Sequence, residues 1–231
     1  MASLVKYISD AGYVNRILTE KQIARILGGS ADRRYAHVKR AIKDGSLVRL
    51  KRGKYVLANK LRTGATHPFA VAQALVPGSY ISMETALAYH GWIPEAVYSV
   101  VSVTPKRKSK EFNHKVFGHF SFCPLALNKI GFLEGVQRIQ LGKQAALLAS
   151  PLRALIDIIA YKKIEWHPKG TSKRAQGTEW IEHGLRIEPE HLLTIHKREL
   201  TALKLVYKHK AAVNFLIQLE KSIAQKRKDA R

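Results

Sequence analysis

The sequence predicts an α+β protein of two domains, in which a mixed α/β C-terminal domain contains an antiparallel sheet and ends in helices. Three features support this prediction: closely spaced helix signals near the N-terminus, β-branched and aromatic segments in the middle of the chain, and helical periodicity after residue 150. Residues 59–67 are polar, contain a glycine and lack clear periodicity. We therefore predict domains of residues 1–63 and 64–231.

The N-terminal domain begins with signals for one short helix followed by a close pair of helices. Residues 2–12 supply the short helix. Thr19-Glu20-Lys21-Gln22 has the pattern of a capping box, in which a hydroxyl and a glutamine satisfy free backbone N–H groups at the start of the next helix. Gly28-Gly29 ends that helix, and Ser30 is placed to cap the following one. The turn between the paired helices is therefore short.

The helix expected at residues 30–43 is rich in arginine. Tyr35, Val38 and Ile42 stand at i, i+3 and i+7, so we predict that they face the core. The opposite stripe then carries Arg33, Arg34, His37 and Arg40. Arginine's planar fork matches guanine O6 and N7, and the first residues of a recognition helix usually lie nearest the base edges. We predict that Arg33, Arg34 and His37 contact bases.

A hairpin is expected next, with strands at residues 47–50 and 54–57 and Gly53 at its tip. Paired helices followed by a cationic hairpin have the order of a winged helix-turn-helix, which binds DNA. A basic helix face is most often only a solvated surface, but here the helix pair, the basic stripe and the hairpin coincide. The predicted DNA-contacting residues are Ser30, Arg33, Arg34, His37, Arg40, Lys51, Arg52 and Lys54.

The composition favours an acidic polymer as partner. The chain has 40 Lys and Arg against 17 Asp and Glu, a formal net charge of +23. Residues 1–63 contain 15 basic and 4 acidic side chains, so the charge is densest there. Cys123 is the single cysteine, which excludes an intrachain disulfide and a cysteine-based zinc site. Since the sequence contains no long apolar segment or secretion signal, we expect a cytoplasmic protein without membrane contact.

The C-terminal domain is predicted to alternate between helices and strands. Helices are expected at residues 68–75 and 82–90, with a short strand at 79–81, and an apolar helix begins at Ser150-Pro151. Further strands are expected at residues 97–104, 115–122, 136–141 and 144–148. A long loop over residues 161–186 then precedes two terminal helices at residues 189–208 and 211–226.

Three segments of this domain resemble a known family. They are Pro-Phe-Ala-Val-Ala at 68–72, Gly-Ser-Tyr-Ile-Ser-Met-Glu-Thr-Ala-Leu-Ala-Tyr-His-Gly at 78–91 and Ser-Pro-Leu-Arg-Ala-Leu-Ile-Asp at 150–157. With the preceding winged helix, the chain resembles the AbiEi antitoxins of type IV toxin-antitoxin systems over most of its length; the last 50 residues match only in helical character.

The resemblance implies two functions. The first is autorepression, in which the N-terminal domain binds double-stranded DNA at inverted repeats in the protein's own promoter. The second is the countering of a separate nucleotidyltransferase-like toxin by the C-terminal domain. Family members also occur without an evident toxin, so this partner stays open. A monomer that pairs on DNA and a stable dimer are equally consistent with the sequence.

Two other classes of function were weighed. Metal-dependent phosphoryl transfer needs clustered carboxylates, and the sequence has no Asp-x-Asp, phosphate loop or Gly-x-Ser-x-Gly turn. His114, His119 and Cys123 would alternate between the faces of a strand, which disfavours a metal site. We therefore expect no enzyme activity, cofactor or metal. An RNA-binding protein without an antitoxin role is the alternative, using the basic loop at residues 106–110 and the cationic tail.

Overall fold

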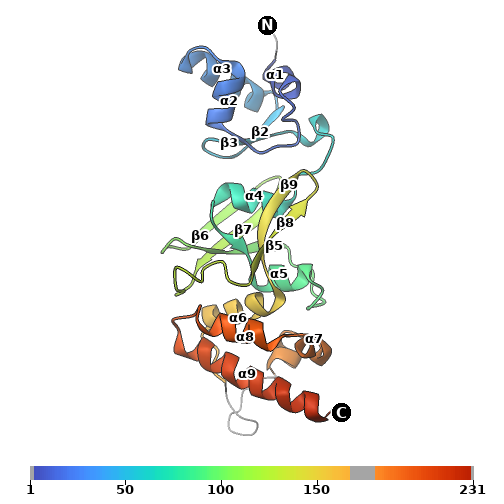
Figure 1. Cartoon of the computed structure of the whole chain (residues 1–231). Coiled ribbons are helices and arrows are strands. Elements are labelled where there is room, and N and C mark those ends of the chain that lie inside the picture. The colour runs from blue at the N-terminus through green and yellow to red at the C-terminus, as the bar shows by residue number, and fades with distance from the viewer. Residues whose placement is uncertain (1–2, 167–179, 230–231) are drawn as a thin grey trace. The chain divides into compact units, whose positions relative to one another are not determined.

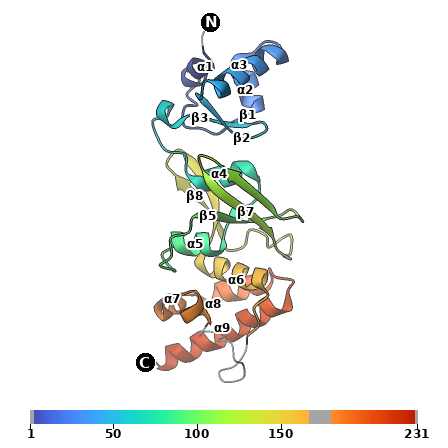
Figure 2. The same ribbon diagram turned by 180° about the vertical axis from the view of Figure 1, so that it is seen from behind.

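The computed structural model describes residues 3–166 and 180–229 (Figures 1 and 2). The chain divides into two compact units, which are described separately: unit 1 is Met1–Pro77 with Gln140–Ala146, and unit 2 is Gly78–Ile139 with Leu147–Arg231. The fold class is α+β with terminal helices, as predicted. The boundary expected near residues 59–67 lies inside unit 1. Among the described residues, no helix is long and apolar enough to cross a membrane.

Unit 1 combines helices with a three-stranded antiparallel sheet of order β1-β3-β2. Its first helices are α1 (Leu4–Asp10), α2 (Glu20–Leu27) and α3 (Ala31–Lys43). The strands are β1 (Leu18–Thr19), β2 (Leu47–Lys51) and β3 (Lys54–Leu57). A 3₁₀ turn, η1 (Asn59–Leu61), and α4 (Pro68–Leu75) follow.

The hydrophobic core of unit 1 takes apolar side chains from each of α1, α2 and α3 and from the sheet. Its buried members are Leu4, Ile8, Leu18, Ile23, Leu27, Ala41, Leu47 and Leu57. In α1 and in α2 the two buried members are four residues apart, a spacing that places side chains on one face. The helices are too short to be stable alone in water, so this shared burial is what holds them in place.

Unit 2 is built on a six-stranded sheet of order β6-β7-β5-β4-β9-β8. In chain order the strands are β4 (Tyr80–Ile81), β5 (Ser99–Thr104), β6 (Lys110–His114), β7 (Gly118–Pro124), β8 (Val136–Leu141) and β9 (Gln144–Ala149). The tip of the β8–β9 hairpin, residues 140–146, is grouped with unit 1. The sequence had not predicted β6 as a separate strand.

The sheet is mixed in direction. Antiparallel pairs join β6 to β7 and β4 to β5, in line with the prediction. Parallel pairs join β5 to β7, with Val101 opposite Ser121, and β4 to β9, with Ile81 opposite Leu148. These were not predicted, because strand periodicity identifies the buried face but carries no information about the direction of the neighbouring strand.

The helices of unit 2 gather around α6. They are α5 (Met83–Tyr89), α6 (Pro151–Lys162), α7 (Pro189–Leu193), α8 (Lys197–Lys204) and α9 (Lys210–Asp229), with a π-helical turn, η2 (Trp180–Gly184). Helix α6 packs against α5, α8 and α9. Almost every side chain of α6 from Leu152 to Ile159 is buried. This agrees with its predicted place in the core of the domain.

The prediction of one helix over residues 189–208 was wrong. The chain leaves α7 at Thr194, whose hydroxyl donates to the His191 carbonyl at 2.7 Å. His196 is extended, with φ −81° and ψ 142°, and precedes α8. A threonine hydroxyl that bonds to a nearby carbonyl competes with helix continuation, and the extended backbone at His196 interrupts the helix. Of the loop predicted at 161–186, residues 167–179 lie outside the described residues.

A buried ion pair lies at the centre of unit 2. Arg153 Nε donates to Asp157 Oδ1 at 3.1 Å, and both side chains have 0% exposure. Tyr80 and Ser82 donate their hydroxyls to Asp157 Oδ2 at 2.9 and 2.6 Å, and Tyr207 donates to Oδ1 at 2.7 Å. The carboxylate thus accepts bonds from α6, from β4 and the residue after it, and from the segment between α8 and α9.

The Arg153 guanidinium uses its remaining donors on the chain around it. It donates to the Glu134 carbonyl at 2.7 Å and to the Tyr80 hydroxyl at 2.5 Å. Burial by itself disfavours its charge, but the Asp157 carboxylate together with Tyr207 and Tyr80 outweighs burial and raises the pKa of Arg153 above its ordinary value. Burial, and then the charge of Asp157, raises the pKa of both Tyr80 and Tyr207 well above 10. The guanidinium of Arg153 is therefore charged and the two tyrosines are protonated at neutral pH.

Replacing Asp157 with asparagine is expected to destabilise unit 2 by about 3–5 kcal/mol, because it leaves a buried guanidinium without its counter-charge. Denaturant unfolding followed by tryptophan fluorescence measures this, since Trp92, Trp166 and Trp180 all belong to unit 2. The control is Glu84→Gln, which breaks an ion pair whose Lys162 and Glu84 side chains are 49% and 31% exposed. It should cost less than about 1 kcal/mol. Equal losses in the two variants would contradict a central role for the buried pair.

Candidate nucleic-acid interface

Helices α2 and α3 are joined by a short, capped turn, as the sequence predicted. The Thr19 hydroxyl accepts from Gln22 N at 3.1 Å, and the Gln22 side chain accepts from Thr19 N at 2.8 Å, which completes the capping box. Gly28 and Gly29 both have positive φ, 60° and 71°, a conformation that strongly favours glycine. Ser30 then caps α3 by accepting from Arg33 N at 3.3 Å. Ser30 is exposed, and this bond fixes it at the start of α3.

The orientation of α3 about its axis differs from the prediction at two residues. Tyr35, expected in the core, is 68% exposed, whereas His37, expected to contact bases, is only 7% exposed. Val38 and Ile42 are partly buried against the core, as expected. The helix therefore turns the 37/41 side inward, where the small side chain of Ala41 lets the chain approach closely. The expectation that His37 lies on the outward stripe of α3 was therefore wrong, and its contact with bases stays a prediction.

The exposed face of α3 is nevertheless basic. Arg33 and Arg40, both predicted to bind DNA, are exposed. Lys39 and Lys43 are exposed as well and were missed by the sequence analysis. Together with Tyr35, the two lysines stand at i, i+4 and i+8, a spacing that places the three side chains on one side of a helix. This spacing is visible in the sequence and could have identified them. The solvent face of α3 thus presents four cations and an exposed aromatic ring.

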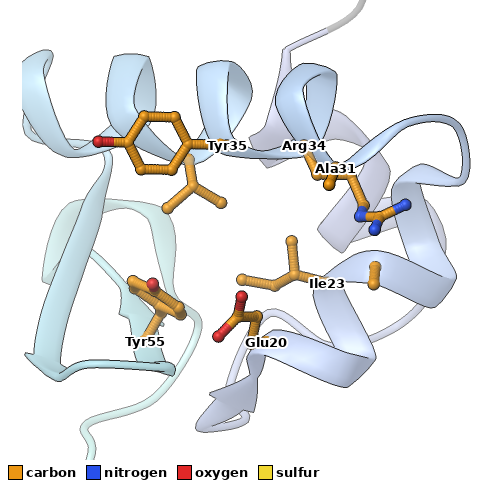
Figure 3. Close-up of a pocket in the computed structure, with 8 residues that line it drawn as sticks. Glu20, Ile23, Ala31, Arg34, Tyr35 and Tyr55 are labelled. Carbon is orange, nitrogen blue, oxygen red and sulfur yellow. The ribbon is translucent and has the colours of Figure 1, made fainter.

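Arg34 differs from the other arginines because its side chain folds back on the turn. Its guanidinium donates to the Gly29 carbonyl. Together with Glu20, Ile23 and Tyr55, it lines a small hollow of about 90 Å³ between α2, α3 and β3. Figure 3 shows Arg34 at one side of this hollow and Tyr35 at the other, both projecting from α3. Arg34 thus lies at the edge of the basic face, in a less open position than Arg33.

The hairpin predicted after α3 is formed by β2 and β3. Gly53 at its tip has φ 74°, and its carbonyl accepts from Glu20 N at 3.0 Å, so the tip is tied to the start of α2. Arg52 is exposed and Lys54 half-buried. The Lys51 ammonium donates to the Leu75 carbonyl, which fixes it against α4. Of the three cations predicted at the hairpin tip, Arg52 is therefore the exposed one.

Unit 2 contains the basic loop on which the RNA-binding alternative rests. The basic loop at residues 106–109 is exposed, and Lys110 begins β6. His90 places its Nε2 2.9 Å from the Ala149 carbonyl, a contact that ties the end of α5 to the end of β9. No group of three His, Cys, Asp or Glu side chains that could hold a metal is found among the residues described.

No protein-family model matches the chain, and a search of the curated proteins finds no match. The resemblance to AbiEi antitoxins therefore stays a prediction from the sequence segments quoted above.

The burial of His37 and the exposure of Tyr35 lead to a stability prediction. Replacing the buried His37 with alanine should destabilise α3 by about 0.5–3 kcal/mol, whereas Tyr35→Ala should change its stability by no more than about 0.5 kcal/mol. Hydrogen–deuterium exchange of peptides covering residues 31–43 measures both effects in the whole protein. Faster exchange in the Tyr35 variant than in the His37 variant would mean that α3 has the opposite orientation.

Proposed function

We propose that this protein is a sequence-specific DNA-binding transcription regulator that represses its own promoter and acts as an antitoxin. The observation that supports DNA binding most directly is the exposed basic face of α3 beside a hairpin with a cationic tip. The order α2, short turn, α3 and hairpin is the order of a winged helix-turn-helix, in which the second helix enters the major groove and the hairpin touches the backbone.

In the proposed complex, the residues of α3 have different tasks. Arg33 lies in the first turn of α3, where recognition helices come nearest to base edges, and its fork suits guanine. Lys39, Arg40 and Lys43 occupy the middle and end of the helix and bind phosphates, which fix orientation without reading sequence. Arg52 at the hairpin tip binds a phosphate or the neighbouring minor groove.

Double-stranded DNA suits this surface better than RNA. An α-helix fits the major groove of B-form DNA, whereas the major groove of an A-form RNA helix is too deep and narrow for side-chain reading. Sequence-specific RNA recognition usually stacks unpaired bases on aromatic side chains. The face of α3 has one such ring, Tyr35, among four cations, which favours a duplex partner.

The antitoxin part of the proposal rests on the resemblance of residues 78–91 and 150–157 to the AbiEi family. It is tested in cells that express a nucleotidyltransferase-like toxin with and without this chain. Restored growth in the presence of the chain would support the assignment. Growth arrest that persists at full expression of the chain would contradict it for that toxin.

The DNA-binding proposal is tested with the duplex immediately upstream of the protein's own reading frame. Fluorescence anisotropy at physiological salt, with excess unrelated duplex as competitor, separates specific from charge-driven binding. Binding that survives competition and shows two chains per inverted repeat supports an autorepressor. If unrelated duplex or RNA displaces the promoter equally well, the protein does not read its promoter.

Arg33→Ala is expected to weaken binding to the specific site by about 1–3 kcal/mol if Arg33 reads a base edge. The loss should be largest at one base-pair position, because the variant no longer distinguishes bases there. A panel of duplexes with single substitutions, titrated against both proteins, measures this. Unchanged affinity and unchanged base preference would remove Arg33 from the interface.

Lys39→Ala and Lys43→Ala should weaken binding to all duplexes alike. Each should flatten the slope of log affinity against log salt by about 0.9, the value for one lost phosphate contact on duplex DNA. Lys108→Ala removes the same charge from the exposed loop of unit 2 and serves as the matched control, with an unchanged slope expected. A change in slope for Lys108→Ala alone would move the interface to the 106–110 loop and favour the RNA-binding alternative.

A further inference from the structure

Unit 2 exposes two large apolar side chains, Ile130 and Leu205, that line one hollow, and a third, Leu133, three residues after Ile130. Ile130 is fully exposed, Leu205 is 76% exposed and Leu133 is 50% exposed. The hollow, of about 650 Å³, lies between the chain after β7 and the end of α8, and Ala202 and Val206 contribute further apolar lining. Clustered exposed apolar side chains on a soluble domain typically mark an interaction site, whereas isolated ones need no explanation. We refer to Ile130, Leu133 and Leu205 with this hollow as the Ile130 surface.

The backbone beneath the Ile130 surface is held by hydrogen bonds between two distant segments. Asn128 N donates to the Val206 carbonyl at 2.8 Å, and Lys208 N donates to the Ala126 carbonyl at 3.0 Å. The Asn128 side chain also donates to the Leu205 carbonyl at 2.5 Å. Gly131 lies so close to Val206 that an added Cβ would be 3.0 Å from Val206 Cγ2. The exposed side chains therefore project from an ordered base.

The buried ion pair supports the same surface from inside. The Arg153 guanidinium donates to the carbonyls of Glu134 and Phe132, at 2.7 and 3.4 Å. Arg153 itself is fixed by Asp157. Since the loop is already ordered, a partner that binds here does not have to supply the free energy for ordering it.

Charges around the hollow indicate the kind of partner. Lys129 lines it, Lys208 lies in the strand-like segment bonded to Ala126, and Arg198 stands one turn before Ala202 on the same side of α8. All three are exposed. Glu134 is the acidic side chain in the lining. The excess of positive charge favours an acidic partner.

A second copy of the chain fits poorly as the occupant. Each copy has a formal net charge of +23, so two copies repel one another. An apolar stripe of an amphipathic helix offers side chains three and four residues apart, which is a common way to fill a groove of this kind. Acidic residues on the flanks of such a helix would be attracted by Lys129 in the lining and by the other exposed cations of these segments.

We propose that the Ile130 surface is a docking site for an amphipathic helix of an acidic partner protein. Its residues all belong to unit 2. The proposal is therefore independent of DNA binding by α3, and either can fail without the other.

The probe for this site is a fluorescein-labelled synthetic helix with leucine at i, i+3, i+4 and i+7 and glutamate at its other positions. Anisotropy with the full-length protein should show saturable binding that weakens with salt. Two matched peptides are controls: one replaces glutamate with lysine, and the other replaces leucine with serine. Neither should bind. Equal binding of the serine peptide would show attraction by charge alone and overturn the proposal, as would absence of binding by the leucine–glutamate peptide.

Variants locate the binding on the protein. Ile130→Glu and Leu205→Glu should each weaken peptide binding at least about tenfold, since they place charge at central apolar contacts. Val116→Glu is the control, because Val116 is also an exposed apolar residue of unit 2, at 60%, but lies in the turn between β6 and β7. It should leave binding unchanged, and none of the three should alter promoter affinity. Equal effects from Val116→Glu would overturn the assignment.

Sedimentation of the protein alone tests whether a second copy of the chain covers the Ile130 surface. A monomer at every concentration is expected, because of the like charge of the copies. A concentration-dependent dimer that Ile130→Glu dissociates would show that a second copy covers the surface, and would overturn the proposal of an acidic partner.

Discussion

The ion pair between Arg153 and Asp157 is the interaction on which unit 2 depends. Both side chains are completely buried, and a charge buried without a partner is strongly destabilising. The pair is tolerated because nearly every polar atom around it is bonded: three hydroxyls reach the carboxylate, and backbone carbonyls receive the guanidinium. Since its partners come from β4, the chain before β8, α6 and the α8–α9 connection, the correct arrangement of these segments is a condition for satisfying the charges.

The same network explains why residues 78–82 and 150–157 stand out in the sequence. Tyr80, Ser82, Arg153 and Asp157 all belong to these segments, and all four side chains are buried. These side chains use their hydrogen-bonding groups on one another and on the backbone. These segments thus have a structural role. The network also supports the Ile130 surface, because the Arg153 guanidinium donates hydrogen bonds to the backbone of its loop.

Unit 1 is stabilised differently, by local turns and a small apolar core. The capping box at Thr19, the two glycines with positive φ and the Ser30 cap fix where α2 ends and α3 begins. The core then holds the helices against the sheet. The outcome is a helix whose inner side carries His37 and Ala41 and whose outer side is cationic. In the two proposals, unit 1 therefore binds a polyanion and unit 2 binds a protein.

Much of the fold follows from the sequence alone, because caps, turns and periodicity are local properties. The capping box, the Gly-Gly turn, the hairpin at Gly53 and the apolar helix after Ser150 were all predicted correctly. What was missed depends on partners far away in the chain. Strand direction and the position of β6 in the sheet are set by neighbours that a local pattern does not identify.

The candidate site shows the same division at the level of single residues. The sequence alone identified a basic helix and a cationic hairpin, since both follow from nearby residues. Only the tertiary structure decided that His37 is buried while Tyr35 faces solvent. It likewise decided that Lys51 is held by a carbonyl of α4. A helix with few large apolar residues can be turned about its axis in more than one way, and the packing of α1, α2 and the sheet against small residues such as Ala41 selects one orientation.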